Sequence, residues 1–359
     1  MNLDKILCNR KRILITGGAG FIGSTLIRKI LNESSATILN LDKLGYASNK
    51  LAIEGKLFNN YETIKNRYKF LKLDLINYPE TVNVINEFSP DIIYHLAAES
   101  HVDNSIAGPK IFMESNIIGT FNLLEASRKY YLSLSDGRKK NFLFHHISTD
   151  EVFGSLGKKG KFSEKTSYSP RSPYSASKAA SDHLVRAWFH TYDLPIIITN
   201  CSNNFGPWQF PEKLLPLTIL NALQGKNIPL YGDGKNIRDW LYVEDHIDAL
   251  LITSNKGKIG ESYCIGGFGE MTNYDLVNKV CSHLDQLNPK NVPHKNLIRY
   301  VKDRPGHDMR YSIDSKKIIE EIGWYPKHTF NQALLKTIQW YLSNPEFHLN
   351  IKRNQNKKP

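Results

Sequence analysis

Cysteine is scarce in this chain, and long apolar runs are absent from it. The four cysteines among 359 residues, Cys8, Cys201, Cys264 and Cys281, are scattered without the spacing of a metal site. This indicates a reducing compartment and no metal centre. The sequence also shows no secretory signal peptide and no apolar run near the length of a membrane span. We therefore expect a cytoplasmic protein with no membrane partner.

The chain has fewer acidic residues than basic ones: 35 Asp and Glu against 47 Lys and Arg, which gives a formal charge of +12. Such an excess can indicate nucleic-acid binding. Here the lysines are spread among many asparagines, and the basic runs are short: Lys139-Lys140, Lys158-Lys159 and the tail from Lys352 to Lys357. We interpret the excess as a composition bias on solvated surfaces and predict no nucleic-acid partner. The mild positive field would still attract a doubly anionic small molecule.

Strand and helix patterns alternate through the first two hundred residues. Strands are predicted at 12–16, 37–41, 68–75, 91–97, 141–148 and 195–200, and helices between them at 24–33, 79–88, 111–130 and 175–192. This alternation predicts an α/β fold with a doubly wound parallel sheet of the Rossmann type. At 359 residues the chain can also bury a second, smaller lobe.

Beyond Asn203 the alternation gives way to loops rich in proline and glycine. We predict an NAD-binding Rossmann domain over 11–203 and a C-terminal α/β substrate lobe over 204–350. Segments near 239–267 are expected to return to the first domain, as strands near 239–250 and 261–267. Residues 1–10 and 351–359 are expected to be frayed ends, and 132–140 an exposed insertion.

A glycine-punctuated turn follows the first predicted strand, in the segment GGAGFIG at 17–23. Gly17, Gly20 and Gly23 permit a tight turn and a close approach to a pyrophosphate at a helix N-terminus. By itself such a trio is also compatible with an ordinary turn. The second strand, however, ends in Asp42, about twenty residues on, where an acid can accept from ribose hydroxyls. These features predict dinucleotide binding, and Asp42 favours NAD over NADP although Lys43 beside it weakens that preference.

Tyr174 and Lys178, in PYSASKAA, lie one turn apart on the predicted helix after Pro173. A tyrosine needs its pKa of about 10 lowered by roughly 3 units, or about 4 kcal/mol, to act as a base near neutrality. The Lys178 ammonium and the positive nicotinamide ring are the expected sources. Tyr174 can then take a hydroxyl proton while hydride leaves the same carbon. In isolation the pair could equally be a surface tyrosine and a solvated lysine.

Asp150 and Glu151 follow the strand NFLFHHIST, with Gly154 shortly after them. Consecutive strand residues point to opposite faces, so both can reach one pocket only if the strand has ended. Two adjacent carboxyls tend to leave one protonated and the other ionised, which suits an elimination of water. A helix cap or a surface salt bridge is the alternative.

Several segments together resemble the dTDP-glucose 4,6-dehydratases, within the extended short-chain dehydrogenase/reductase superfamily. The resemblance runs from about 11 to 345 and includes HLAAESHVDNSI, STDEVFG, CSNNFGPWQFPEKLLP, YGDGKNIRDWLYVEDH and DRPGHDMRY. It implies a lyase that converts dTDP-glucose to dTDP-4-keto-6-deoxyglucose and water, in deoxysugar (rhamnose-type) nucleotide biosynthesis. NAD is the implied cofactor, and a homodimer joined through helices such as 111–130 and 175–192 is the implied assembly.

The resemblance also implies residue roles. Catalysis is assigned to Thr149, Asp150 as proton donor, Glu151 as acceptor, Tyr174 and Lys178. Cofactor contacts are assigned to Gly17, Gly20, Phe21, Ile22, Gly23, Asp42, Lys43, Leu44, Gly45, Asp74, Leu75, Leu96, Ala97, Ala98, Glu99, Ser100, Ser115, Tyr174, Lys178 and Asn204. Substrate contacts are assigned to Ser100, Thr149, Asn203, Lys213, Arg238, Asn273, Asp303, Arg304, Pro305, Gly306 and His307, whose basic members suit a diphosphate.

Some positions depart from the family pattern. Gly45 replaces a threonine, Asn104 an arginine, and Phe153 and Phe205 tyrosines. The implied mechanism oxidises C4, eliminates water across C5 and C6, and returns hydride to C6. A dehydratase of a UDP- or GDP-hexose, a nucleotide-sugar 4-epimerase, and a non-catalytic NAD- or RNA-binding relative remain alternatives. An epimerase needs no acid-base pair for elimination, so Asp150 and Glu151 argue against it.

Overall fold

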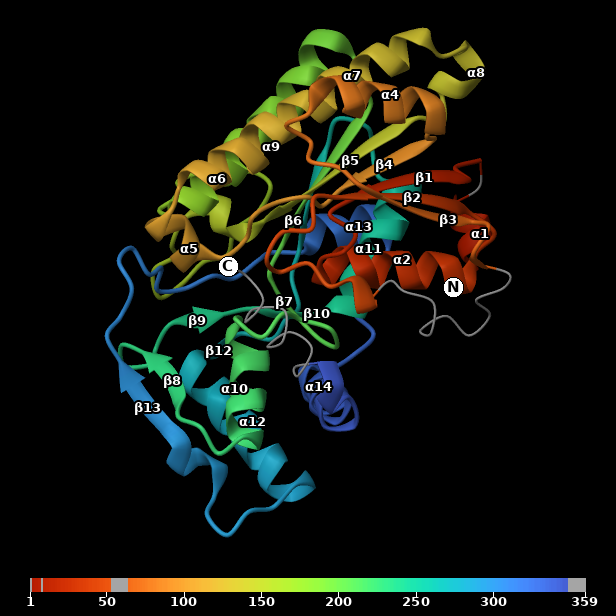
Figure 1. Cartoon of the computed structure of the whole chain (residues 1–359). Coiled ribbons are helices and arrows are strands. Elements are labelled where there is room, and N and C mark those ends of the chain that lie inside the picture. The colour runs from red at the N-terminus through yellow and green to blue at the C-terminus, as the bar shows by residue number, and fades with distance from the viewer. Residues whose placement is uncertain (1, 8, 53–63, 348–359) are drawn as a thin grey trace.

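A seven-stranded parallel sheet forms the centre of the protein, as a computed structural model shows for residues 2–7, 9–52 and 64–347 (Figure 1). Its strand order is β11-β6-β5-β4-β1-β2-β3. The strands are β1 (Arg12–Thr16), β2 (Thr37–Asp42), β3 (Tyr68–Lys72), β4 (Ile92–His95), β5 (Leu143–Thr149), β6 (Ile196–Cys201) and β11 (Ser262–Ile265). The reversal of order between β1 and β4 confirms the predicted doubly wound Rossmann fold.

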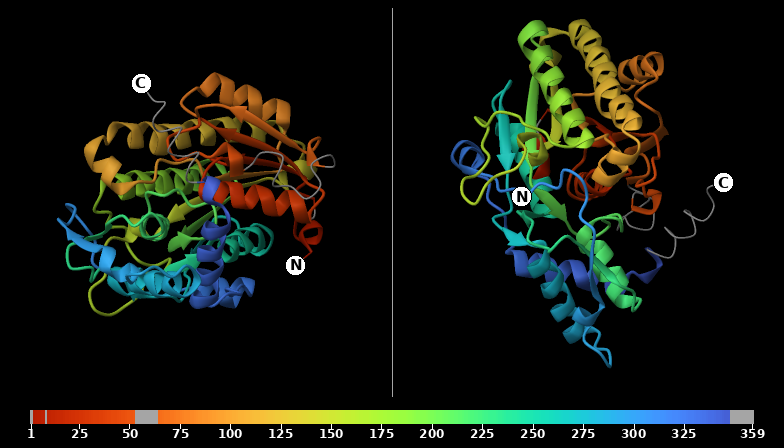
Figure 2. Two further views of the ribbon diagram at one scale, coloured as in Figure 1. Left: turned by 60° about the horizontal axis from the view of Figure 1, so that its bottom comes forward. Right: turned by 90° about the vertical axis from the view of Figure 1, so that its left-hand side faces the viewer.

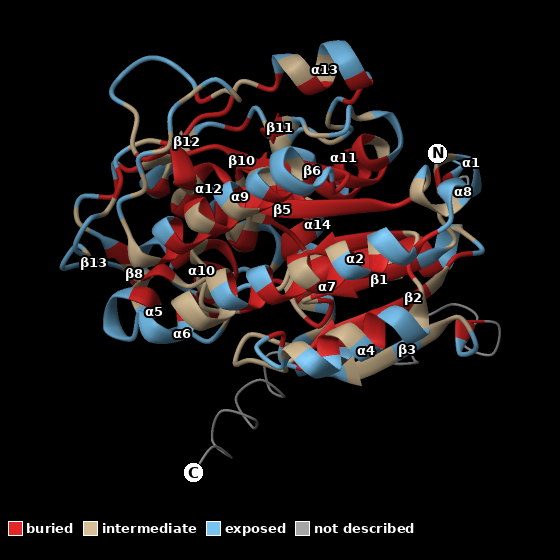
Figure 3. Ribbon diagram, turned by 90° about the horizontal axis from the view of Figure 1, so that it is seen from above, coloured by how far each residue is buried: buried red, intermediate tan, exposed pale blue. Residues whose placement is uncertain are grey.

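Helices cover both faces of this sheet, which explains why the inner strands β4, β5 and β6 are buried along their whole length. On one face lie α2 (Phe21–Glu33) and α11 (Val243–Lys256), and on the other α4 (Tyr78–Phe88), α7 (Gly119–Ser133) and α9 (Pro173–Tyr192). Alternate strand residues feed the two cores, since Ile13 and Ile15 pack toward α2 while Leu14 packs toward α4 and α7. Figure 3 shows the resulting buried sheet between partly exposed helices.

A second lobe lies beside the carboxyl edge of the sheet (Figures 1 and 2). Its helices are α10 (Leu214–Leu223), α12 (Asn273–Leu287) and α14 (Phe330–Ser343), and they share one apolar core that includes Ile219, Leu276 and Leu334. Its short sheets pair β8 (Ile228–Tyr231) with β13 (Ile298–Val301), β7 (Asn203–Phe205) with β10 (Trp240–Tyr242), and β9 (Ile237–Arg238) with β12 (Met271–Thr272). The predicted domain limits at 203 and 204 stay a prediction, which limited proteolysis can test.

Shorter elements complete the described part of the chain. They are α1 (Leu3–Leu7), α5 (Val102–Ala107), α6 (Lys110–Phe112), the π-helix η3 (Met113–Ile118), α8 (Asp136–Lys139), α13 (Lys316–Ile322), and the 3-10 turns η1 (Lys50–Ala52), η4 (Asp150–Phe153) and η5 (His294–Leu297). No helix in the described part of the chain, short or long, has both the length and the apolar character needed to span a bilayer.

Two sequence-based expectations about these elements are wrong. Residues 239–250 do not return a strand to the main sheet: β10 pairs with β7, and the chain then enters α11, whose apolar residues cover the sheet instead. The N-terminal segment is not frayed, because Leu3 and Leu7 on α1 are buried in the core beneath β1. The strand predicted at 261–267 is confirmed as β11, and the tail at 351–359 lies outside the described residues.

Candidate active site

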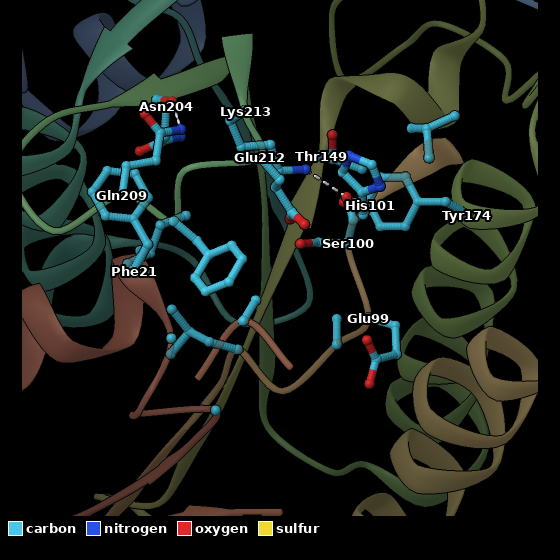
Figure 4. A pocket seen from close by; sticks show the side chains of 18 of the residues that line it. Phe21, Glu99, Ser100, His101, Thr149, Tyr174, Asn204, Gln209, Glu212 and Lys213 are labelled. Atoms are coloured by element: carbon cyan, nitrogen blue, oxygen red, sulfur yellow. Dashed lines mark hydrogen bonds between the residues drawn. The ribbon is translucent and has the colours of Figure 1, made fainter. Parts of the chain in front are cut away.

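One cavity of about 570 Å³ opens where the carboxyl ends of the strands meet the second lobe. It is lined by segments that directly follow β1, β2, β4, β5 and β6, and by residues of α9, α10 and β8. Figure 4 shows Tyr174 and Thr149 facing it beside Ser100 and Lys213, with Phe21 and Asn204 on another wall. Segments far apart in the sequence therefore meet in one pocket.

Most of the predicted site residues line this cavity. All five predicted catalytic residues do, as do the predicted cofactor contacts except Leu44, and the predicted substrate contacts except Asp303, Pro305 and Gly306. Leu44 has φ +61° and turns its side chain into the core below the sheet. Asp303 instead accepts hydrogen bonds from His307 Nδ1 at 2.6 Å and from the Arg304 backbone N–H at 2.8 Å. Asp303 thus contacts Arg304 and His307, which do line the cavity.

The glycine turn has no room for side chains. A Cβ at Gly17, where φ is +74°, would lie 2.6 Å from the Ala97 nitrogen, and one at Gly23 would lie 2.4 Å from the Gly17 oxygen. The turn leads directly into α2, whose N-cap is Gly20 and whose first N–H groups have no side-chain cap. A bare backbone turn at a helix N-terminus suits a pyrophosphate. The residues present thus fit a dinucleotide.

The Asp42 carboxylate links the loop that follows β2 to the glycine turn. Its Oδ2 accepts from the Ala19 N–H at 3.0 Å, and its Oδ1 accepts from the Leu44 N–H at 2.7 Å and from Ser48 Oγ at 3.0 Å. Lys43 beside it does not pair with Asp42. The Lys43 ammonium lies 2.8 Å from Glu99 Oε1 and also hydrogen-bonds Ser115 Oγ. The positive charge that weakened the NAD preference is therefore neutralised by Glu99.

Tyr174 and Lys178 both lie on α9, which starts at a capping box formed by Ser172 and Ser175. Both side chains are buried, and Lys178 Nζ donates to the Ile147 carbonyl oxygen at 2.9 Å. Burial and the nearby Glu151 carboxyl hold the pKa of Tyr174 well above its usual value, while burial lowers the pKa of Lys178. The expected lowering of the tyrosine pKa is therefore not found in the protein alone, where burial and Glu151 raise it.

Asp150 and Glu151 stand on η4, immediately after β5 ends at Thr149. The Thr149 hydroxyl caps this turn by accepting from the Glu151 N–H at 3.2 Å, and it donates to Asp150 Oδ1 at 3.3 Å. Asp150 Oδ2 is buried without a hydrogen-bond partner in the described part of the chain. Burial and Glu151 raise the pKa of Asp150 well above its usual range. Such an oxygen is suited to carry a proton and to donate it.

Glu151 sits in a different electrostatic environment. Burial raises its pKa too, but the charges of Lys213, Arg304 and Arg238 oppose that rise. The two carboxyls therefore differ, with Asp150 held more firmly in the protonated form and Glu151 held nearer to ionisation. Different environments of this kind separate an acid from a base.

Three cations line the part of the cavity that the second lobe closes. Lys213 Nζ donates to the Ser100 carbonyl oxygen at 2.7 Å (Figure 4), and Arg238 donates to the Asp308 carbonyl oxygen at 2.9 Å and stacks 4.2 Å over the Tyr311 ring. Arg304 reaches Asp103 at 3.4 Å, and its Nε is buried without a partner in the described part of the chain. Donors in such an arrangement suit an anionic group with several oxygens.

Sequence reasoning missed several lining residues, among them Tyr46, His101, Asp103, Gln209, Glu212 and Tyr231. His101 and Glu212 each adjoin a predicted contact, Ser100 and Lys213, so proximity along the chain was an available signal. Tyr231 ends β8 and donates to Asp103 Oδ2 at 3.0 Å across the two lobes. No sequence pattern indicates that contact, because it depends on how the lobes are packed.

The comparisons with known proteins agree with this geometry. The family described as GDP-mannose 4,6 dehydratase matches residues 14–337. The chain belongs to this family. A dTDP-glucose 4,6-dehydratase of Escherichia coli is 53% identical over 349 residues, which cover 94% of this chain and 95% of the relative.

Solved structures lead to the same group of enzymes. The dTDP-glucose 4,6-dehydratase of Bacillus anthracis, solved in complex with NAD, is 42% identical with a TM-score of 0.82, covering 94% of this chain and 99% of that one. That of Streptomyces venezuelae, solved with NAD and a second ligand bound, is 38% identical with a TM-score of 0.82, covering 94% and 98%. The dehydratase family thus shares both the fold and nearly the full length of this chain.

Proposed function

We propose that this protein is an NAD-dependent dTDP-glucose 4,6-dehydratase, a hydro-lyase that forms dTDP-4-keto-6-deoxyglucose and water. One observation carries the proposal: an elimination pair, Asp150 and Glu151, shares a cavity with the Tyr174/Lys178 pair and a bare glycine turn. Curated relatives of that name at about half identity over nearly the full length, and neighbours solved with NAD, support it.

Tyr174 serves as the base for the sugar C4 hydroxyl in this proposal. When bound in this cavity, NAD would supply the hydride acceptor for C4 and the hydride donor for C6, and its positive ring charge would stabilise a phenolate at Tyr174. Lys178 adds a second positive charge on the same face of α9. Thr149, at the end of β5, is placed to donate to the C4 oxygen and to stabilise charge that develops there.

The acid pair performs the elimination. A 4-keto group makes the C5 proton acidic, and Glu151 takes that proton and returns a proton to C5 when hydride reaches C6. Asp150 protonates the C6 hydroxyl, which leaves as water, in keeping with its buried, unpartnered Oδ2 and its raised pKa. The cations Lys213, Arg238 and Arg304 hold the diphosphate, and their charges also favour the ionised form of Glu151. Every proposed step uses a residue that lines the cavity.

The proposal is tested by incubating the purified protein with dTDP-, UDP- and GDP-hexoses in parallel. The expected result is a 4-keto-6-deoxy product from dTDP-glucose, detected by mass spectrometry as the loss of one water. Turnover only of a UDP- or GDP-hexose would overturn the substrate assignment. Epimerised hexose with no loss of water would overturn the dehydratase assignment itself.

The assembly and the compartment belong to the same proposal. We place the enzyme in the cytoplasm as a homodimer. The large apolar side chains Ile111, Ile118 and Phe121, from α6 to α7, and Tyr192 on α9 are between 39% and 48% exposed. They occupy the helices through which the dimer was predicted to form. Sedimentation equilibrium on the wild type and on Phe121→Glu tests it, since a monomeric wild type would contradict the dimer.

A further inference from the structure

Asp182 is a fully buried carboxylate behind the catalytic residues, one helical turn after Lys178 on α9. Four side-chain groups surround it. His146 Nε2 lies 3.1 Å from Oδ1, while Oδ2 accepts from Ser148 Oγ at 2.9 Å, Tyr168 OH at 2.7 Å and Asn200 Nδ2 at 3.1 Å. Asp182 does not line the cavity, and the proposed mechanism gives it no part.

The donors around Asp182 come from the elements that position the site. His146 and Ser148 belong to the end of β5, directly before Thr149, and Asn200 belongs to β6. Asn200 Nδ2 also donates to the Thr149 carbonyl oxygen at 3.2 Å. One carboxylate thus joins α9, which carries Tyr174 and Lys178, to the strand end that carries Thr149 and the acid pair.

Asp182 is also ionised. Burial alone would raise its pKa, but the hydrogen bonds from His146 and Ser148 and the charge of Lys178 oppose burial, and the pKa is lowered to about 2. In return the charge of Asp182 raises the pKa of Lys178 against the lowering that burial causes. The two buried charges therefore stabilise each other.

Other titratable groups also surround Lys178 in the described part of the chain. His95 on β4 and His146 on β5 have pKa values lowered by burial and are neutral near pH 7, and burial raises the pKa of the Cys201 thiol on β6 to about 12. Asp150 and Glu151 on η4, which packs against α9, have pKa values raised by burial. Asp182 is the carboxylate whose charge raises the pKa of Lys178.

We propose that Asp182 is a positioning residue, the buried counter-charge that keeps Lys178 protonated and locks α9 to the ends of β5 and β6. This inference rests on the proposed function of the site. It predicts that the charge of Asp182, and not only its hydrogen bonds, matters for the reaction.

The test compares Asp182→Asn with Tyr168→Phe, which removes one donor to Asp182 and leaves the charge. Thermal unfolding is followed from about pH 6 to about pH 9. An uncompensated Lys178 has a folded pKa further below its unfolded value, so the folded state binds fewer protons, and stability rises with pH. We expect Asp182→Asn to recover stability toward pH 9 relative to the wild type, and Tyr168→Phe to be destabilised equally at every pH.

Activity gives a second readout. The rate of C4 oxidation is measured against pH by the absorbance of reduced cofactor. The alkaline limb of this profile should move by about one pH unit or more to lower pH in Asp182→Asn, and it should stay in place in Tyr168→Phe. The stability arm needs no substrate, so it still decides the inference if dTDP-glucose proves to be the wrong substrate. An Asp182→Asn profile parallel to the wild type in both readouts would overturn the proposal.

A double variant covers the case in which Asp182→Asn does not fold. Adding Lys178→Met removes the charge that lacks its partner, so the double variant should fold and should lose the extra pH dependence. A double variant as unstable as Asp182→Asn alone would show that Asp182 acts only through its hydrogen bonds, and would contradict the counter-charge role.

Discussion

Tyr174 is the residue on which the first chemical step depends. We predict that Tyr174→Phe lowers the rate of C4 oxidation by about 10²-fold or more, since general-base catalysis is worth that much. Cofactor content, measured by absorbance after denaturation, should stay unchanged, because many other groups line the dinucleotide part of the cavity. Turnover within about tenfold of the wild type would exclude Tyr174 as the base.

The two carboxyls of η4 should separate into distinct roles when each is replaced by its amide. Asp150→Asn still permits oxidation at C4 but cannot protonate the leaving hydroxyl, so reduced cofactor should accumulate on the enzyme and be visible by its absorbance. Glu151→Gln should slow the exchange of the C5 proton with solvent deuterium, followed by NMR. If neither variant changes elimination, the carboxyls are structural.

Much of the residue-level site could be predicted from the sequence, because its members sit in short motifs at strand ends. Gly17 follows β1, Asp42 and Thr149 end β2 and β5, and Tyr174 lies in the first turn of α9. Parallel strands bring their carboxyl ends to one edge of the sheet. The neutralisation of Lys43 by Glu99 and the contact of Tyr231 with Asp103 could not be predicted. Both are side-chain pairs between distant segments, and their formation depends on packing that no local pattern encodes.

At the scale of elements, the start of α9 fixes the position of Tyr174. Ser172 caps this helix by accepting from the Ser175 N–H at 3.0 Å. We predict that Ser172→Ala costs about 1 kcal/mol of stability and also lowers kcat, because Tyr174 lies in the first helical turn. Thr329→Ala, at the equivalent capping box of α14, should cost a similar amount in denaturant unfolding and leave kcat unchanged. Equal kcat losses in the two variants would contradict a local effect.

Element types were predictable where periodicity was strong, and connections were not. The first six strands are confirmed because each is a short apolar run between turn residues. The stretch 239–250 was misread since its first residues, Trp240 to Tyr242, do form a strand, but one that pairs with β7. An apolar run indicates burial, and the partner that buries it is decided by tertiary packing.

At the scale of the molecule, acid should destabilise the fold through its buried histidines. Burial and the neighbouring His246 lower the pKa of His145 to about 3, and burial and Lys178 lower that of His146 to about 4. Both histidines stay neutral in the folded state, but each binds a proton in the unfolded state below about pH 6.5. The free energy of unfolding therefore decreases as the pH is lowered, by about 1.4 kcal/mol per histidine per pH unit.

The raised pKa values of Asp150 and Glu151 act in the opposite direction at pH values above the usual pKa of a carboxyl, so the histidine contribution has to be isolated. Between about pH 6.5 and pH 5, His145→Gln should reduce the slope of the unfolding free energy against pH by the contribution of one histidine, about 1.4 kcal/mol per pH unit. An unchanged slope would show that His145 does not stay neutral in the folded state.

The complete reaction is a property of the whole cavity and can be followed with an isotope. Substrate that carries deuterium at C4 should give product with deuterium at C6, even when a large excess of unlabelled NADH is present outside. The expectation follows from one cavity that holds both the oxidation pair and the elimination pair, so that no second substrate is needed. Loss of the label to external cofactor would indicate an ordinary dehydrogenase.

The strand order of the main sheet has a consequence for synthesis on the ribosome. β6 ends at Cys201, yet its outer neighbour β11 is formed by residues 262–265, after much of the second lobe has been translated. Until then the nascent chain presents the backbone N–H and C=O groups along the outer edge of β6 without their partner, and an unpaired strand edge is prone to association with other chains. During this interval the growing polypeptide therefore exposes a strand edge that β11 covers in the finished protein.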